Sequence, residues 1–378
     1  IYVGSYYAFC IWIGLGAVAI YSVAQRYLTP VPSFLISVTV VATVPFILIS
    51  ENLDDHDRSN RYAARDFGYD YLNSCRKDAI LFTNGDNDTY PVWYNQEVES
   101  VRTDIRVVLQ PYLGTDWYID QMRHDINQAE ALPISFSREK FLNGNRSIIR
   151  IVDRLEDFVE LNEALEFIKS DNPKTKLLFN DSNYRDYLPA RKLKLSVDKE
   201  RLIESGCFTS DEIEKTEDAL YFEINKNHLL RSDLIVLDII ASNNWERPLH
   251  FLSPMELRNL GLDKYLVKEG FAYRLVPYKS PVNNSPYSYQ MNTSRTYDLM
   301  MQKFRWGNIG NPDVWLDHTI RRQIEVLGIR RTYAQLAKQM TESGYKQQAI
   351  EVLDKCMELL PFITITNDYY IVRIIALY

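Results

Sequence analysis

The chain has 378 residues, of which 46% are hydrophobic and 25% charged, so it can build two or three compact domains and is not mainly disordered. Its formal net charge of -7 argues against nucleic acid as a partner, because binding to phosphate needs a concentrated Lys/Arg surface. The 4 cysteines form no CxxC pair and indicate neither a disulfide framework nor a zinc site.

Residues 1–50 predict a membrane-embedded helical hairpin. They carry one charged side chain, Arg26, and the apolar segments 6–24 and 34–50 are long enough to cross a bilayer as helices. A short turn with two prolines joins them. Because the sequence starts at Ile1 and the first span begins almost at once, we expect the chain to be the C-terminal part of a longer membrane protein. A trimmed protein with two spans is the alternative.

The segment after the second span is basic as well as acidic. Ser59 is a candidate cap for a helix to about Asn73, which would place Arg58, Arg61 and Arg65 on one helical face beside the bilayer. Such a stripe could hold a lipid phosphate. The alternative is a solvated face that pairs with neighbouring aspartates. Positive charges alone would place the soluble part in the cytoplasm.

Residues 51–311 predict an α/β domain. Strands and helices alternate along it, which favours a layered fold with a largely parallel sheet. Residues 142–168 fit a helix and a strand equally well. The expected strands are 79–83, 105–110, 175–179, 191–197, 219–224, 247–252 and 271–278, with helices at about 91–101, 115–126 (capped by Thr115) and 231–244.

Residues 312–378 predict a helical segment. Residues 333–361 have small residues and Gly344 at the offsets of a tetratricopeptide (TPR) repeat. One such unit cannot bury its apolar face alone. We therefore expect it to stack on the α/β domain or to continue into further repeats.

The loop after the strand 79–83 is the first candidate site, because ligands of open α/β sheets bind beyond the carboxyl ends of strands. Two carboxylates in it could bind a divalent cation, as in sugar-nucleotide-dependent transferases. The alternative is a turn whose Asp88 or Thr89 caps a helix beginning at Pro91. The candidate ligand residues of this loop are Asn84, Asp86, Asn87 and Asp88.

Further candidates combine tryptophans with polar groups. Trp93 and Trp117 are possible sugar-stacking residues, although such rings more often lie in a core. Asn244, Trp245 and Arg247 would suit a polar ligand, or would simply end a helix and form a salt-bridged loop. The sequence contains no HExxH, G-x-S-x-G, P-loop or dinucleotide glycine pattern, so it predicts no catalytic set and no metal site.

Six long stretches carry a family resemblance: residues 1–16, 57–75, 80–108, 115–122, 237–251 and 265–277. In these the chain resembles a Bacteroidota family of polytopic membrane proteins related to the protein O-mannosyltransferases. The resemblance implies a GT-C type glycosyltransferase that uses a polyprenyl-phosphate sugar, in the inner membrane with the soluble domain facing the periplasm. The catalytic acid of such enzymes lies in their first extracytoplasmic loop, to which no residue here corresponds. The chain itself is expected to carry no cofactor.

Three hypotheses remain open. The chain is the end of a membrane glycosyltransferase that contacts membrane lipid and binds a protein or glycan acceptor. Alternatively, it is a non-catalytic assembly module that docks an envelope protein through its helical segment. In the third, the soluble part is a metal-dependent enzyme centred on Asp86 and Asp88.

Overall fold

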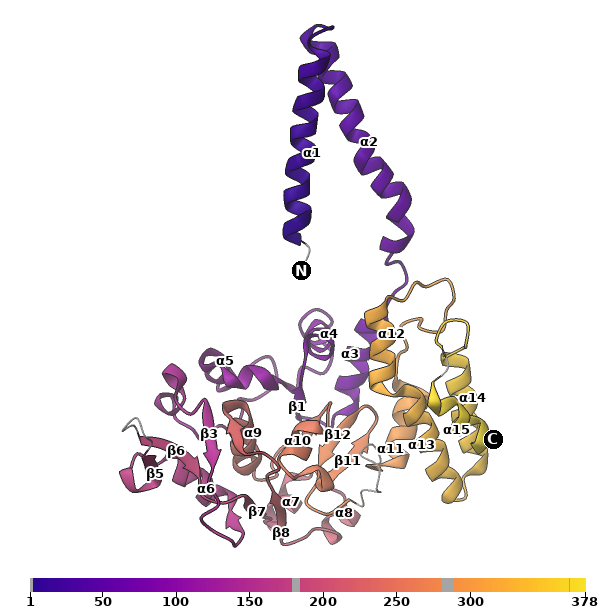
Figure 1. Cartoon of the computed structure of the whole chain (residues 1–378). Helices are drawn as coiled ribbons and strands as arrows, with labels where there is room; N and C mark the ends of the chain where they lie inside the picture. Colours follow the sequence, from indigo (N-terminus) through magenta and orange to yellow (C-terminus); the bar gives the residue numbers. More distant parts are fainter. Residues whose placement is uncertain (1–2, 179–183, 281–288, 367) are drawn as a thin grey trace. The chain divides into compact units, whose positions relative to one another are not determined.

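A computed structural model describes residues 3–178, 184–280, 289–366 and 368–378 of the chain. The chain divides into two compact units, residues 1–60 and residues 61–378 (Figure 1).

The first unit is the predicted helical hairpin. It consists of α1 (Val3–Ala24) and α2 (Pro30–His56). Val3–Ala24 and Pro30–Leu53 are long and apolar enough to cross a membrane. The Ser37 hydroxyl donates a hydrogen bond to the Ala17 carbonyl (2.6 Å), which satisfies a polar group where the two helices meet.

The second unit is built around a mixed sheet of six strands, in the order β13-β11-β12-β10-β1-β2. β1 pairs in parallel with β2 and β10, whereas β12 is antiparallel to both β10 and β11. The prediction of an α/β domain is confirmed, but that of a largely parallel sheet is wrong. The strands are β1 (Ile80–Thr83), β2 (Arg106–Leu109), β10 (Leu249–Phe251), β11 (Leu266–Glu269), β12 (Ala272–Leu275) and β13 (Gln290–Met291).

Helices pack on both faces of this sheet. Ile80 and Phe82 of β1 belong to the same core as α9, whereas Leu81, on the other face, belongs to the core that contains α3 and α4. The three-layer arrangement therefore follows from strands such as β1 and β2, whose residues are all buried. The helices around the sheet are α3 (Ala63–Ser74), α4 (Asp86–Glu97), α5 (Asp116–Met122), α9 (Arg231–Asn243), α10 (Met255–Asn259) and α11 (Thr293–Asp298).

Two smaller sheets extend the unit, with strand orders β5-β6-β3-β9 and β4-β7-β8. The ambiguous region 142–168 contains both strands and a helix, β3, β4 and most of α6. The remaining elements here are β3 (Ile148–Ile151), β4 (Val159–Glu160), α6 (Leu161–Lys169), β5 (Lys176–Leu178), β6 (Tyr184–Leu188), β7 (Lys192–Ser196), α7 (Lys199–Ser205), α8 (Ser210–Glu214), β8 (Ala219–Glu223) and β9 (His228–Leu230).

The C-terminal segment is helical, as predicted, and stacks on the α/β domain. Tyr333 and Leu353 share one hydrophobic core with Phe67 of α3. Gly344, with φ +88°, makes the turn between α13 and α14. That this pair is a TPR repeat stays a prediction. The helices are α12 (His318–Leu327), α13 (Ile329–Glu342), α14 (Lys346–Leu359) and α15 (Tyr369–Leu377).

Candidate functional site

A groove of about 630 Å³ lies at the carboxyl ends of β1 and β10. The chain enters it after each of these parallel strands, and α12 and α13 supply further lining residues from the C-terminal segment. This is the edge at which open α/β sheets bind ligands. The polar and charged lining includes Asn84, Asp88, Glu256, Lys268, Tyr273 and Arg331.

Asp88 has a structural task in this groove. Its carboxylate accepts hydrogen bonds from the backbone N–H groups of Asn84 (2.9 Å) and Gly85 (2.7 Å), and so closes the turn that begins α4. The interpretation as a turn is thus confirmed, but Asp88 is the third residue of the helix and Gly85, not Asp88 or Thr89, is its cap residue. The predicted start of the helix was also wrong, because the helix begins at Asp86 and not at Pro91.

Pro91 lies inside α4, where it cannot donate a hydrogen bond to the carbonyl of Asn87. The Gln323 side chain of α12 supplies the missing donor, with Nε2 at 2.9 Å from that carbonyl oxygen. The contact ties the C-terminal helices to the groove.

Glu256, at the start of α10, faces Asn84 across the groove. Asn84 Nδ2 lies 3.5 Å from Glu256 Oε2, at the outer limit of a hydrogen bond. Burial raises the pKa of Glu256, and the nearby Asp88 carboxylate adds to this effect. A carboxyl with a raised pKa beside an amide can exchange hydrogen bonds with hydroxyl groups of a ligand.

Lys268 of β11 forms another part of the lining and is only 3% exposed. Its Nζ donates to Thr332 Oγ1 of α13 (2.6 Å). Burial, together with the positive charge of Arg331, lowers the pKa of Lys268 to about 7. The rings of Phe271 and Tyr273 add aromatic surface beside it.

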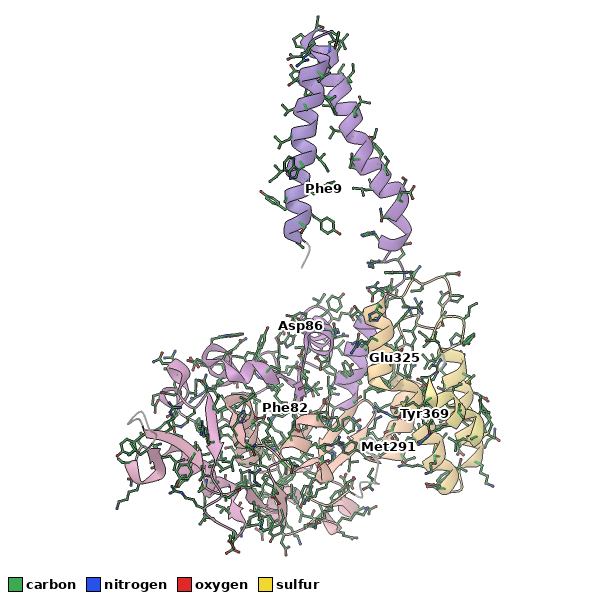
Figure 2. The ribbon with its side chains drawn as sticks, in the orientation of Figure 1. Phe9, Phe82, Asp86, Met291, Glu325 and Tyr369 are labelled. Carbon is green, nitrogen blue, oxygen red and sulfur yellow. The ribbon has the colours of Figure 1, made fainter. Side chains whose placement is uncertain are left out.

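Asn87 of the first candidate loop also lines the groove, whereas Asp86 and the two tryptophans lie outside it. Asp86 is exposed on the first turn of α4 (Figure 2). Trp93 packs against both hydrophobic cores, with Tyr90 beside it (5.7 Å between ring centroids). Trp117 is 59% exposed and packs its edge against Tyr112. Sugar stacking by either tryptophan stays a prediction.

Asn244, Trp245 and Arg247 lie at the opposite edge of the sheet, because they precede β10 whereas the groove follows it. Asn244 ends α9 with φ 42°, as predicted. Trp245 is buried against Phe208. The Arg247 side chain donates to the carbonyls of residues 78, 130 and 131, so it joins three segments and does not reach the groove.

The three arginines after the hairpin do not share a helical face. The prediction was wrong because α3 begins at Ala63, after Arg58 and Arg61. Arg61 pairs with Asp317 (2.8 Å), and Arg65 makes a two-pronged contact with Glu99 (2.5 and 3.0 Å). Their contact with a lipid phosphate stays a prediction.

No group of three His, Cys, Asp or Glu side chains that could hold a metal ion occurs among the described residues. The carboxylate of Asp88 is already occupied by backbone donors. The proposed cation site of Asp86 and Asp88 therefore gains no support from the geometry.

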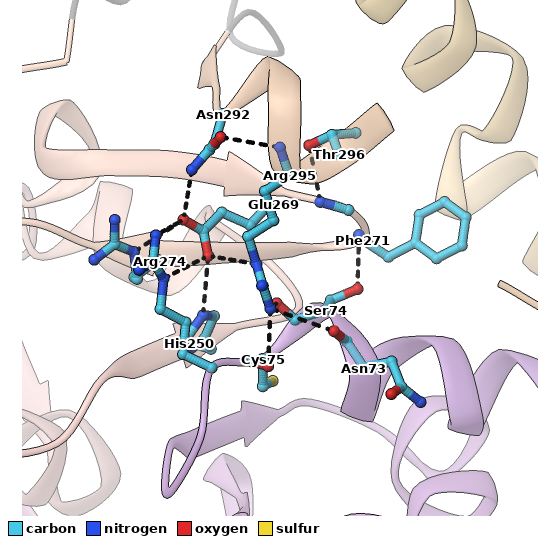
Figure 3. Close-up of polar contacts among 12 residues, drawn as sticks. Asn73, Ser74, Cys75, His250, Glu269, Phe271, Arg274, Asn292, Arg295 and Thr296 are labelled. Atoms are coloured by element: carbon cyan, nitrogen blue, oxygen red, sulfur yellow. Dashed lines mark hydrogen bonds and ion pairs between the residues drawn. The ribbon is translucent and has the colours of Figure 1, made fainter. Parts of the chain in front are cut away.

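A second polar cluster surrounds Glu269, the residue after Lys268 (Figure 3). Arg76, Arg274 and Asn292 donate to its carboxylate, and Arg295 Nε lies 3.2 Å away. Burial raises the pKa of Glu269, but Arg274, His250 and Arg76 outweigh it and hold the pKa well below its usual value. Arg295 also donates to carbonyls at the end of α3, so the cluster fastens that helix to the sheet.

The sequence analysis missed Glu256, Lys268, Arg322 and Arg331. One signal for Lys268 was present, because a lysine interrupts the apolar run Tyr265–Val267 just before a Gly-containing turn. The arginines gave no signal, since a charged residue on a helix is ordinarily solvated.

The fold defines a mixed α/β module that carries a polar groove and follows an apolar helical hairpin. The family model described as TMEM260-associated domain 2 matches residues 64–295, and the chain belongs to this family. No match was found among curated proteins or among solved structures.

Proposed function

We propose that the chain is the acceptor-binding portion of a membrane glycosyltransferase of the GT-C, protein O-mannosyltransferase-like type. The matched family and the two apolar helices support the class of protein. The proposal further places the hairpin in the inner membrane, the α/β module in the periplasm, and a polyprenyl-phosphate sugar as the donor.

The groove is the observation that carries this proposal. It combines hydrogen-bonding groups, Asn84 and Glu256, with the aromatic surface of Phe271 and Tyr273. Polar groups that fix orientation on an apolar wall are what recognition of a hydroxyl-bearing acceptor requires. In the transfer itself, the acceptor oxygen bonds to the anomeric carbon, its proton passes to a carboxylate base, and the polyprenyl phosphate leaves. We assign that base to no residue of this chain.

The test is carried out in cells on the intact gene product. A double variant, Asn84→Ala with Glu256→Gln, removes the hydrogen-bonding groups of the groove, whereas Glu342→Gln changes an exposed carboxylate of α13 as a control. Mass spectrometry of envelope glycoproteins should show loss of O-linked sugar with the double variant and no change with the control. Equal glycosylation in all three strains, with equal amounts of folded protein in the membrane, would refute the proposal.

A second candidate is an assembly module of an envelope complex. The observation that favours it is the row of exposed apolar side chains on α15, where Tyr369, Val372 and Ile375 are 67%, 63% and 64% exposed. A stable envelope protein that co-purifies with the chain, together with unchanged glycosylation in the double variant, would favour this function over the first.

A further inference from the structure

Lys268 carries a buried amine for which the described residues supply no counter-charge. Its side chain lines the groove, and the hydrogen-bond partner of its Nζ is a neutral hydroxyl, Thr332 Oγ1. Among the described residues, no carboxylate forms an ion pair with it, and the charge acting on it most is the positive Arg331. A buried ammonium without an anion is costly, so such a site is built for an anion or holds a neutral amine.

The position of Arg331 strengthens the positive charge of this part of the groove. Its guanidinium passes over Gly328, where an added Cβ would meet its nitrogen at 2.8 Å, so a residue with a side chain would displace it. Arg322 and His318 of α12 line the same groove. The acidic groups facing the groove, Asp88 of α4 and Glu256 of α10, are not ion-paired with Lys268 among the described residues.

We propose that Lys268 and Arg331 bind an oxyanion, a phosphate or a carboxylate, on the ligand that occupies the groove. This inference rests on the proposed function, because the oxyanion would be part of the acceptor or of a group attached to the acceptor. An ammonium and a guanidinium in a partly closed site form strong, charge-assisted hydrogen bonds to such an anion. Asn84 and Glu256 then remain available for the neutral hydroxyl groups of the same ligand.

Binding of the anion must also change the protonation of Lys268. In the free protein at pH 8 the amine is mostly neutral, since burial and Arg331 lower its pKa to about 7. A bound anion stabilises the charged form, so the protein takes up a proton as it binds. The other groups lining the groove that can gain or lose a proton are Tyr71, Asp88, Glu256, Tyr273 and His318, and their contributions persist when Lys268 is replaced.

The experiment is calorimetric titration of the full chain in detergent at pH 8, with sulfate as the tetrahedral probe and acetate as the planar probe. Neither probe titrates near this pH, so measurements in two buffers of different ionisation enthalpy report proton uptake by the protein. We expect Lys268→Met to remove the contribution of Lys268 to that uptake and to weaken binding by about tenfold or more. Arg331→Gln should weaken binding and retain the uptake, and Lys338→Met, an exposed lysine of α13, should change neither.

The outcomes separate the possible sources of the anion and the two proposals. Binding of sulfate but not acetate supports a phosphate ligand, and binding of acetate but not sulfate supports a carboxylate ligand. Binding of both supports an oxyanion site that does not select between them. No binding of either probe, or binding that Lys268→Met leaves unchanged, overturns the inference. The Asn84→Ala/Glu256→Gln variant should still bind the probe. If glycosylation does not depend on Asn84 and Glu256 while the probe still binds, only the proposed function fails.

Discussion

The buried amine of Lys268 predicts an unusual dependence of stability on pH. In the unfolded chain its pKa is the ordinary 10.5, and in the folded chain burial and Arg331 lower it to about 7. Between these values the unfolded state binds more protons than the folded state, so the free energy of unfolding rises as the pH increases from 7 towards 10.5. Below pH 7 the folded state carries the full cost of a buried charge.

Replacing Lys268 by methionine removes this cost at similar side-chain volume. The lowering of its pKa from 10.5 to about 7 corresponds to roughly 5 kcal/mol, of which roughly 3 kcal/mol should be recovered between pH 7 and 9.5. Thr332 is not left without a partner, because its hydroxyl also donates to the Gly328 carbonyl (3.0 Å). At pH 7 and below, Lys268→Met should therefore be more stable than the wild type.

The assay is urea unfolding of the full chain in a mild detergent, followed by circular dichroism at several values of pH from 6 to 9.5. The difference between variant and wild type should be largest at low pH and shrink steadily as the pH rises. Lys338→Met serves as the control and should follow the wild type. Parallel curves for wild type and Lys268→Met would show that Lys268 stays charged in the folded protein, and the reasoning would fail.

Three further predictions concern contacts that hold the groove and its supports. Burial lowers the pKa of His250 to about 4, so between pH 6.5 and 4 the unfolded chain binds a proton that the folded chain does not. The free energy of unfolding of the wild type should therefore fall by roughly 3 kcal/mol over this range. Urea unfolding at each pH should show a smaller fall for His250→Asn. Gln323→Ala should lower the free energy of unfolding by roughly 1–3 kcal/mol in the wild-type protein. The loss should be smaller in a Pro91→Ala background, because the restored backbone N–H can donate to the Asn87 carbonyl. A double-mutant cycle that shows no coupling between the two substitutions would contradict this prediction. Gly68→Ala places a Cβ 2.3 Å from the Pro91 carbonyl oxygen and should cost about 1–3 kcal/mol in thermal unfolding, whereas Gly114→Ala, with nothing within 4 Å, should cost much less.

The parts of the fold that could be predicted from the sequence are those whose pattern is local. β1 and β2 are short runs of residues that are buried on both faces, and the segments 6–24 and 34–50 are continuously apolar, so each indicates its own structure. The two-residue strands β4 and β13 carry no such pattern and form only because neighbouring strands pair with them. They could not be predicted from periodicity.

The relative direction of the strands in the central sheet was predicted wrongly for a related reason. β11 and β12 form an antiparallel hairpin through Gly270, which has φ +59°. Two consecutive charged residues, Lys268 and Glu269, end the apolar run of β11 and hide it as a strand. Without β11 the hairpin is invisible, and the alternation of the remaining elements indicates parallel pairing.

These two charged neighbours also show how a buried charge can be assigned to folding or to binding. Alternation along the strand turns them to opposite faces. Glu269 finds its counter-charges within the chain, in Arg76 and Arg274, and its burial is fully explained by the attachment of α3 to the sheet. Lys268 finds a hydroxyl and a second cation instead, and it lines a groove. The burial of Glu269 therefore has a structural cause within the chain, whereas the burial of Lys268 has none among the described residues. For this reason we infer a ligand at Lys268 and not at Glu269.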